Sequence, residues 1–201
     1  LAGTHKGGYS LFRFDLTSYI NAGGPNSVTI AVDNSDFEDV YPSNADFTFY
    51  GGLYRGVNLI TGLDQCHFSL KAGLCGVYAD ASVQGNTGVL RIEPHIEGDR
   101  SGVTAADTVW NRDGEAVAQR KAEAGEELTI ELADPILWNG LENPYLYTVR
   151  AALVRGGEEI DAVETRVGFR TISFDHEKGC FLNGKHIKLK GVSRHQDRYH
   201  M

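Results

Sequence analysis

The stretch Cys180–Met201, CFLNGKHIKLKGVSRHQDRYHM, decides how the last part of the chain folds. Its Asn183-Gly184 pair predicts a hairpin turn, because both central residues of a type I′ turn need positive φ. Cys180–Leu182 forms the first strand of this hairpin, and Lys185–Val192 forms the second, which is expected to enter a buried sheet. Polar residues follow directly, and a strand that ends in titratable groups is typical of the active-site end of a (β/α)8 barrel. We expect a barrel to begin here, although no further barrel strands follow.

Three other stretches belong with this one. VGFR precedes the hairpin at Val167–Arg170, DFTFYGGLYRGV lies at Asp46–Val57, and Leu137-Trp138 is followed by ENPYLY at Glu142–Tyr147. Taken in their order along the chain, these stretches resemble the family-two glycoside hydrolases, which include β-galactosidases, β-glucuronidases and β-mannosidases. The resemblance covers almost the whole chain, and it implies an internal piece of a larger enzyme.

The fold class expected from the resemblance and the strand pattern is all-β. It consists of a partial jelly-roll β-sandwich, an immunoglobulin-like β-sandwich, and a C-terminal hairpin and strand that would start a TIM barrel. Residues 1–63 are assigned to the end of a sugar-binding jelly roll and residues 64–74 to a linker. Residues 75–171 are assigned to the immunoglobulin-like domain, and residues 172–201 to the hairpin and first strand of the catalytic barrel.

Strand patterns support this division independently of the resemblance. Val28–Val32 is a near-continuous apolar run and predicts a central strand. Val77–Gln84 alternates apolar and polar residues, as a half-buried strand does. Asp113-Gly114 and Gly156-Gly157 predict hairpin turns in the same domain. Short strands separated by turns in this way indicate a sandwich.

Composition limits the classes of partner. The chain has 201 residues, of which 41% are hydrophobic and 23% charged, as in a globular protein. Its formal net charge of −8 argues against nucleic acid and an anionic membrane as partners, whereas a neutral carbohydrate is compatible with it. No apolar run approaches the roughly 20 residues that span a bilayer.

The three cysteines, Cys66, Cys75 and Cys180, are an odd number and form no C-x-x-C pair. This pattern argues against a disulfide framework and against a zinc site. Reduced thiols favour a cytoplasmic protein. The sequence begins Leu-Ala-Gly, without an initiator Met or a signal-like segment. In an internal piece of a larger protein this absence says nothing about secretion, so a periplasmic or secreted protein stays open as the alternative.

The resemblance implies that the catalytic residues lie outside this chain. Retaining glycosidases need two carboxyl groups about 5–5.5 Å apart, and in this family both are glutamates at the ends of later barrel strands. We expect the glutamates present here to lie in turns and on polar strand faces, and the chain alone to be inactive. It is expected to hold no metal and no cofactor, while the resemblance leaves room for Mg or Na ions in the parent enzyme.

Two residues are candidates for substrate binding. The resemblance implies that His195 lines the sugar pocket, where an imidazole can donate to a sugar hydroxyl. The alternative for His195 is a structural histidine at the barrel rim. Asp46 lies nine positions before Arg55, the spacing at which the family places an aspartate that touches the non-reducing sugar. The alternative for Asp46 is an Asx turn that caps a loop.

Supporting roles are expected for three arginine and aspartate side chains. Arg194 and Asp197 are expected to orient the loops around His195. Arg55 is expected to be structural, pairing with a carboxylate. Trp138 could be a platform for a glycan, but the more economical interpretation is that it packs in the domain core.

Two classes of function follow. The first is a piece of a β-galactosidase-type enzyme that hydrolyses terminal β-glycosidic bonds, because the ending Arg194–Asp197 fits galactosidases better than glucuronidases. Its partner would be a β-galactoside, and its parent would be a homo-oligomer. The second is a free-standing β-sandwich module for carbohydrate binding or adhesion. The apolar strand Lys185–Val192 with its polar ending distinguishes the two classes, since an adhesion module does not need such a strand.

Overall fold

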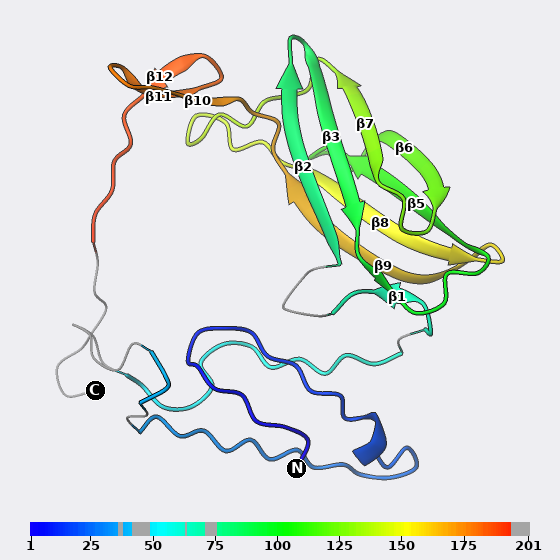
Figure 1. Cartoon of the computed structure of the whole chain (residues 1–201). Helices are drawn as coiled ribbons and strands as arrows, with labels where there is room; N and C mark the ends of the chain where they lie inside the picture. Colours follow the sequence, from blue (N-terminus) through cyan, green and yellow to red (C-terminus); the bar gives the residue numbers. More distant parts are fainter. Residues whose placement is uncertain (36–37, 42–48, 63, 71–75, 194–201) are drawn as a thin grey trace. The chain divides into compact units, whose positions relative to one another are not determined.

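The computed structural model describes the chain except for residues 36–37, 42–48, 63, 71–75 and 194–201. Contacts divide the chain into two compact units, Leu1–Ile60 with Gly191–Met201, and Thr61–Lys190 (Figure 1). All strands assigned to described residues belong to the second unit. The predicted all-β class is therefore confirmed. No helix among the described residues is long and apolar enough to cross a membrane.

The second unit is a β-sandwich with a small appended sheet. Its strands are β1 His67–Phe68, β2 Val77–Gln84, β3 Thr87–Pro94, β4 Ile96–Glu97, β5 Val103–Trp110, β6 Ala116–Glu123, β7 Leu128–Ala133, β8 Tyr147–Arg155, β9 Glu158–Val167, β10 Ile172–Asp175, β11 Gly179–Leu182 and β12 Lys185–Ile187. One sheet has the order β2-β3-β7 and the other β6-β5-β8-β9, and their pairs are antiparallel. Strands β10-β11-β12 form a three-stranded antiparallel sheet, the meander.

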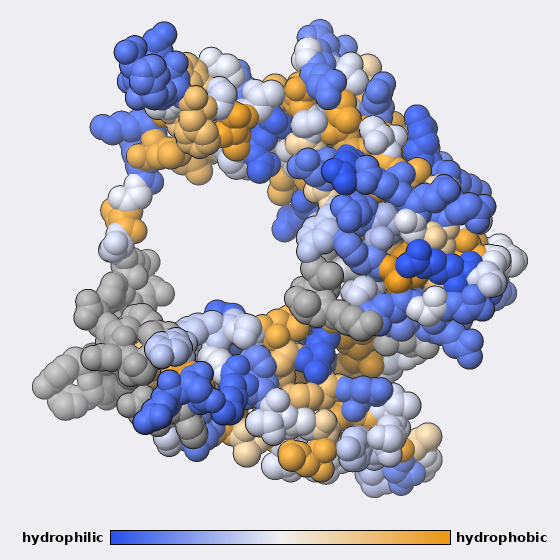
Figure 2. Space-filling model, viewed as in Figure 1, coloured by the Kyte–Doolittle hydropathy of each residue, from blue (hydrophilic) through white to orange (hydrophobic). Residues whose placement is uncertain are grey.

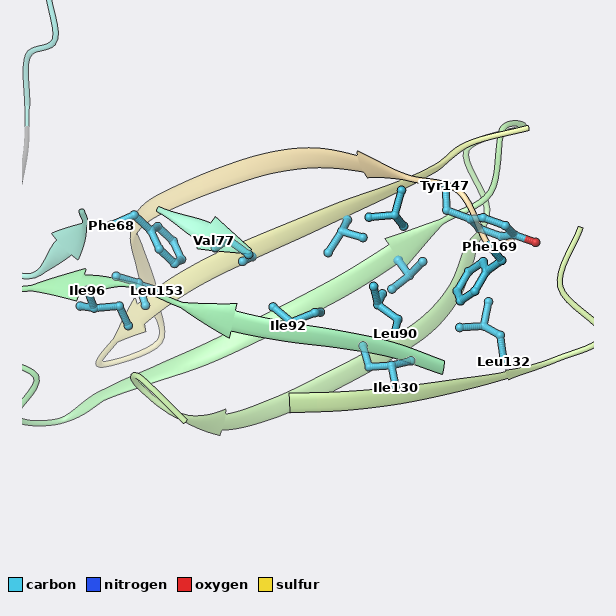
Figure 3. Packing of buried hydrophobic residues seen from close by; sticks show 14 of the residues in the cluster. Phe68, Val77, Leu90, Ile92, Ile96, Ile130, Leu132, Tyr147, Leu153 and Phe169 are labelled. Carbon is cyan, nitrogen blue, oxygen red and sulfur yellow. The ribbon is translucent and has the colours of Figure 1, made fainter. Parts of the chain in front are cut away.

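The core lies between the two large sheets (Figure 3). Successive side chains of a strand point to opposite faces, so the alternation in β3 buries Leu90 and Ile92 while Arg91 stays exposed. The alternation predicted for Val77–Gln84 is also present, in β2. Phe169, which follows β9, is fully buried at the end of this core. The core confirms that this part of the chain is a sandwich.

The predicted turns are present. Asn183 and Gly184 connect β11 to β12 with φ of 50° and 75°, and Gly156 and Gly157 connect β8 to β9 with φ of 61° and 90°. Both pairs have the positive φ that a type I′ turn requires, which favours asparagine and glycine. Gly114 lies in the β5–β6 connection with φ of 83°.

The strand expected over Lys185–Val192 is shorter than predicted. It ends at Ile187 as β12, and Leu189 and Val192 are exposed. Its partner β11 begins at Gly179, and Cys180 already pairs with Ile187. Because the two strands are antiparallel, β12 loses its partner near the start of β11. Apolar residues beyond that point do not by themselves extend a strand.

The segment assigned to a linker, residues 64–74, is partly core. Its residues 67–68 form β1, which pairs with β4, and the side chains of Cys66 and Phe68 are completely buried. Two residues of strand are too few for a periodic signal, so the sequence did not reveal it. The linker assignment is wrong for this part, because Phe68 packs in the main core cluster.

In the first unit, the described residues form no strand and a single 3-10 turn, η1, at Thr17–Tyr19. The strand predicted at Val28–Val32 is not formed, and the side chains of Val28, Ile30 and Val32 are exposed. An apolar run has strand propensity, but a strand also needs a neighbour for its backbone groups. A turn at Asn21 is held by the Asn26 side chain, which donates from Nδ2 to the Asn21 carbonyl at 2.9 Å.

Candidate functional site

The residues predicted to bind substrate or support it are Asp46, Arg194, His195 and Asp197, and all four lie outside the described residues. Arg55 is described, and it donates from Nη1 to the carbonyl of Tyr9 at 3.0 Å. Among the described residues its partner is thus a backbone oxygen, and no carboxylate of this part of the chain pairs with it. The polar chemistry that can be described in detail belongs to the unit Thr61–Lys190.

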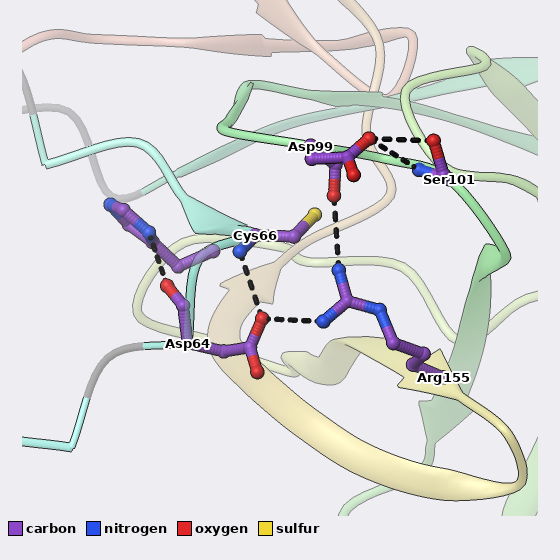
Figure 4. A network of polar contacts seen from close by, with 6 residues as sticks. Asp64, Cys66, Asp99, Ser101 and Arg155 are labelled. Carbon is purple, nitrogen blue, oxygen red and sulfur yellow. Dashed lines mark hydrogen bonds and ion pairs between the residues drawn. The ribbon is translucent and has the colours of Figure 1, made fainter.

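A polar network joins the start of this unit to the end of β8 (Figure 4). Arg155 donates from Nη1 to Asp64 Oδ1 at 2.8 Å and from Nη2 to the carbonyl of Asp99 at 3.0 Å. The same Asp64 oxygen accepts from the Cys66 backbone at 2.9 Å, and the Asp99 carboxylate accepts from Ser101 Oγ at 2.7 Å. One guanidinium therefore fixes two loops that are far apart in sequence.

The electrostatics of this network are structural. The backbone hydrogen bond from Cys66, followed by the Arg155 side chain, holds the pKa of Asp64 below its ordinary value against the opposing effect of burial. Burial raises the pKa of the Cys66 thiol, so it stays protonated at neutral pH. A protonated, fully buried thiol is no nucleophile, so Cys66 is a packing residue of the core.

Asp107 is a buried carboxyl that was not among the predicted site residues. It lies on the inward face of β5 between Ala105 and Val109, and only 3% of its surface is exposed. Burial raises its pKa to about 6, and its Oδ1 has no hydrogen-bond partner among the described residues. The alternation Val103, Ala105, Asp107, Val109 was the available signal, because it places a carboxyl at a core position.

Trp138 lies in the loop of residues 134–146, which connects β7 to β8. Its ring is half-buried, with the Arg170 guanidinium carbon 5.3 Å from the ring centroid. A Cβ at Gly168 would come within 2.8 Å of the Trp138 Cβ, so the glycine permits this close packing. The interpretation of Trp138 as a packing residue fits this geometry better than a glycan platform.

A polar and an apolar recess, both shallow, lie on the described surface of this unit. The polar one of about 430 Å³ is lined by Thr148, Glu164, Thr165 and Arg166. The apolar one of about 380 Å³ lies over the meander, where Figure 2 shows apolar residues gathered, and Phe174, Ile187 and Leu189 contribute to it. Neither contains a glutamate pair of the kind that retaining glycosidases use. Within the described part of the chain, no group of three or more His, Cys, Asp or Glu side chains could hold a metal ion.

Taken together, the described residues define a β-sandwich module whose polar groups hold backbone segments in place. The meander follows this module in the sequence. Residues 76–170 match the family described as Glycosyl hydrolases family 2. This module is thus a domain of that family, and the chain belongs to the family-two glycosyl hydrolases, as the resemblance predicted.

Individual relatives extend the match to almost the whole chain. A "Beta-glucuronidase" of Bacteroides fragilis is 35% identical and covers 98% of this chain. A "Beta-galactosidase" of Thermoanaerobacter pseudethanolicus is 31% identical and covers 96%. The crystal structure of an FMN-binding beta-glucuronidase from Facaelibacterium prausnitzii L2-6 has a TM-score of 0.85 and 33% identity over 98% of this chain. The chain spans 30%, 26% and 30% of the length of these three proteins.

Proposed function

We propose that this stretch works within a longer family-two glycoside hydrolase that removes terminal sugars joined by β-glycosidic bonds. The observation that carries the proposal is the similarity of 96–98% of the chain to relatives named beta-glucuronidase and beta-galactosidase. In this proposal the stretch supplies the end of a sugar-binding domain, the sandwich, and the start of a catalytic barrel. Two glutamates outside the stretch perform the retaining reaction.

The sugar is the finer part of the proposal. The ending Arg194-His195-Gln196-Asp197 favours a β-galactoside. A β-glucuronide is the second candidate, and it is supported by the 35% identity to a relative named beta-glucuronidase. A glucuronide carries a carboxylate that a galactoside lacks, so its pocket needs a cation where a galactoside needs only neutral hydrogen-bonding groups.

The proposed roles of residues in this stretch concern binding. Asp46 accepts a hydrogen bond from a hydroxyl of the non-reducing sugar, and His195 donates one to the same sugar unit. Arg194 and Asp197 hold the loop that carries His195. A buried hydroxyl that loses its partner costs about 1–3 kcal/mol, so each binding residue contributes measurably to specificity.

The experiment has two parts. The chain of 201 residues should hydrolyse neither aryl β-galactosides nor aryl β-glucuronides, because no described residues provide a catalytic carboxyl pair. The full-length protein that carries this stretch should hydrolyse one of them. Turnover that follows the 201-residue chain through gel filtration would overturn the assignment of catalysis to residues outside it. Sugar binding by this chain together with an inactive full-length protein would favour a carbohydrate-binding module instead.

Substitutions in the full-length protein test the residue roles. Asp46→Ala and His195→Ala should each lower kcat/KM by about tenfold to a hundredfold, with the Tm nearly unchanged. His176→Ala is the matched control, because this histidine lies in the β10–β11 turn with its side chain almost fully exposed. Reduced Tm with unchanged kcat/KM in the first two variants would make both residues structural.

A further inference from the structure

The sequence contains two Asn-Gly pairs, and the fold brings them together. Asn139-Gly140 lies in the 134–146 loop, and Asn183-Gly184 forms the turn between β11 and β12. Asn183 donates from Nδ2 to Asn139 Oδ1 at 3.2 Å, although the two residues are 44 positions apart. Asn-Gly is the dipeptide most prone to deamidation, because glycine leaves the attacking backbone nitrogen uncrowded. The contact therefore joins two chemically labile sites.

The Asn183 amide links the meander to the sandwich, beside the exposed ion pair of Lys185 with Glu142 at 2.9 Å. It donates to the carbonyl of Trp138 at 3.0 Å as well as to Asn139, and its Oδ1 accepts from the backbone of Thr171 at 2.9 Å. Both hydrogens of the side chain and its oxygen are thus used. Trp138 is in turn fixed to the core, because its backbone donates to the carbonyl of the fully buried Phe169 at 2.9 Å.

We propose that Asn183 is a deamidation site, and that its conversion to aspartate or isoaspartate releases the meander β10-β11-β12 from the 134–146 loop. The backbone nitrogen of Gly184 attacks Cγ of Asn183 and forms a five-membered succinimide. The Cγ–NH2 bond breaks, and ammonia leaves with the proton of the attacking nitrogen. Water then opens the ring at either carbonyl, giving aspartate or isoaspartate.

The consequence follows from donors and acceptors. A carboxylate at position 183 has no hydrogen to donate, so it would place negative oxygens against the acceptor oxygens of Trp138 and Asn139. Isoaspartate also lengthens the backbone of a two-residue turn and disturbs the pairing of β11 with β12. Because the amide nitrogen has left as ammonia, the donor cannot be restored and the change proceeds in one direction.

Deamidation of Asn139 affects the contact between the meander and the 134–146 loop differently from deamidation of Asn183. Asn139 accepts from Asn183 through its oxygen, and its Nδ2 donates to Glu142 Oε2 at 3.3 Å. A carboxylate at position 139 would still accept from Asn183, so the link to the meander is kept, although its second oxygen would face the Glu142 carboxylate in place of the lost donor. Asn139→Asp is therefore the matched control for Asn183→Asp, because both introduce the same charge into the same contact.

The first test follows the chain itself in mildly alkaline buffer. Peptide mass spectrometry should show aspartate and isoaspartate accumulating at Asn183, more slowly in the folded chain than in the same chain held in urea. Amide hydrogen exchange of the converted chains should be about tenfold or more faster in β10–β12 and unchanged in β3 and β8. Absence of conversion at Asn183 in the folded chain, or unchanged exchange after conversion, would overturn the proposal.

Three variants separate the causes. Asn183→Asp should reproduce the fast exchange of β10–β12, whereas Asn139→Asp should stay close to the unaltered chain. Asn183→Gly keeps a residue that accepts positive φ and removes the amide without adding charge, so its β10–β12 amides should also exchange faster. Equal exchange in Asn183→Asp and Asn139→Asp would show that the Asn183 donors do not hold the meander.

Discussion

Asp107 on β5 lies directly opposite Arg120 on β6, yet no hydrogen bond joins their side chains in the described structure. Arg120 is exposed on an edge strand and donates from Nη1 to the neighbouring carbonyl of Gln119 at 2.8 Å. Asp107 is left facing the core without compensation. A buried charge of this kind opposes folding, because desolvation favours the neutral form.

The first prediction is that Asp107→Val stabilises the sandwich at neutral pH. The folded-state pKa of Asp107 is raised from 3.8 to about 6, so the folded chain binds a proton more tightly than the unfolded chain. The free energy of unfolding should therefore fall as pH rises from about 4 to about 6, by at most about 3 kcal/mol. Urea denaturation of Asp107→Val should show a gain of about 1–3 kcal/mol at neutral pH that shrinks at acid pH.

Asp80→Val is the control for this prediction. Asp80 lies on β2 with an exposed side chain, so its replacement should change the free energy of unfolding by less than about 0.5 kcal/mol. If Asp107→Val brought no gain at neutral pH, the carboxyl would have a compensating partner. A gain equal at all pH values would show that ionisation of Asp107 does not destabilise the fold.

The second prediction concerns where the sandwich domain begins. A shortened chain of residues 61–190 should unfold cooperatively and at a higher temperature than one of residues 76–170. The shorter version lacks Cys66 and Phe68, which are completely buried in the core. Removing a buried phenylalanine side chain alone costs about 3–5 kcal/mol. Calorimetry of both versions is the measurement.

A chain of residues 61–170 is the matched control for the second prediction. It keeps β1 and removes only the meander, so its Tm should stay closer to that of residues 61–190. Equal Tm values for the versions beginning at residues 61 and 76 would show that β1 adds nothing to the stability of the domain.

The third prediction compares two glycines with nearly equal backbone angles. Gly98 has φ of 89°, and a Cβ there would lie 1.6 Å from the carbonyl oxygen of Gln65. Gly114 has φ of 83°, with nothing within 4 Å of its Cβ position. Gly114→Ala should cost about 1–2 kcal/mol for its left-handed conformation, whereas Gly98→Ala should cost at least about 2 kcal/mol more.

Chemical denaturation of the two variants measures this difference. Since backbone strain is common to both substitutions, the excess in Gly98→Ala reports the contact with the Gln65 carbonyl. Similar losses would mean that the residues around Gln65 move aside at little cost.

The fourth prediction concerns the ion pair of Asp64 and Arg155. Asp64→Asn should lower the Tm clearly more than Glu142→Gln, which breaks the exposed pair of Glu142 with Lys185. Asp64 and Arg155 are about one-third exposed, and Arg155 also holds a second loop, whereas both members of the control pair are 65% exposed. Thermal unfolding at neutral pH is the measurement.

The pH dependence of the fourth prediction has a definite sign. The pKa of Asp64 is lowered in the folded state, first by the Cys66 backbone and then by Arg155. Its stabilising contribution is present above its unfolded pKa and disappears as pH falls through the folded value. The Tm difference between the parent chain and Asp64→Asn should therefore vanish in acid. A difference that persisted there would point to a steric effect of the substitution.

Local chemistry was enough for much of the fold. Positive φ at Asn183-Gly184 and at Gly156-Gly157 follows from the residues themselves, and the alternation in β2 follows from a half-buried strand. Where partners were needed, the sequence predictions failed. The run Val28–Val32 has no ladder in the described residues, and the strand after Lys185 ends with its partner.

Local sequence patterns predicted less of the candidate site than of the fold. Asp46 and His195 were chosen through the family resemblance, since neither spacing nor periodicity places two residues so far apart beside one sugar. Asp107 could have been found, because a carboxyl interrupts the apolar positions of an alternating strand. The sequence could not show that Asp107 lacks a hydrogen-bond partner, because this depends on which side chains of the neighbouring strands reach the carboxyl.

By itself, the sequence determined the strand class, the hairpin turns and the family, because each of these is written in short stretches of neighbouring residues. Only the tertiary structure decided that Cys66 and Phe68 belong to the core, that Arg155 reaches Asp64, and that the two Asn-Gly pairs meet. These contacts join residues tens of positions apart. They form only when the register of the sheets and the packing of the loops bring the groups within hydrogen-bond or van der Waals distance, and no local pattern encodes that distance.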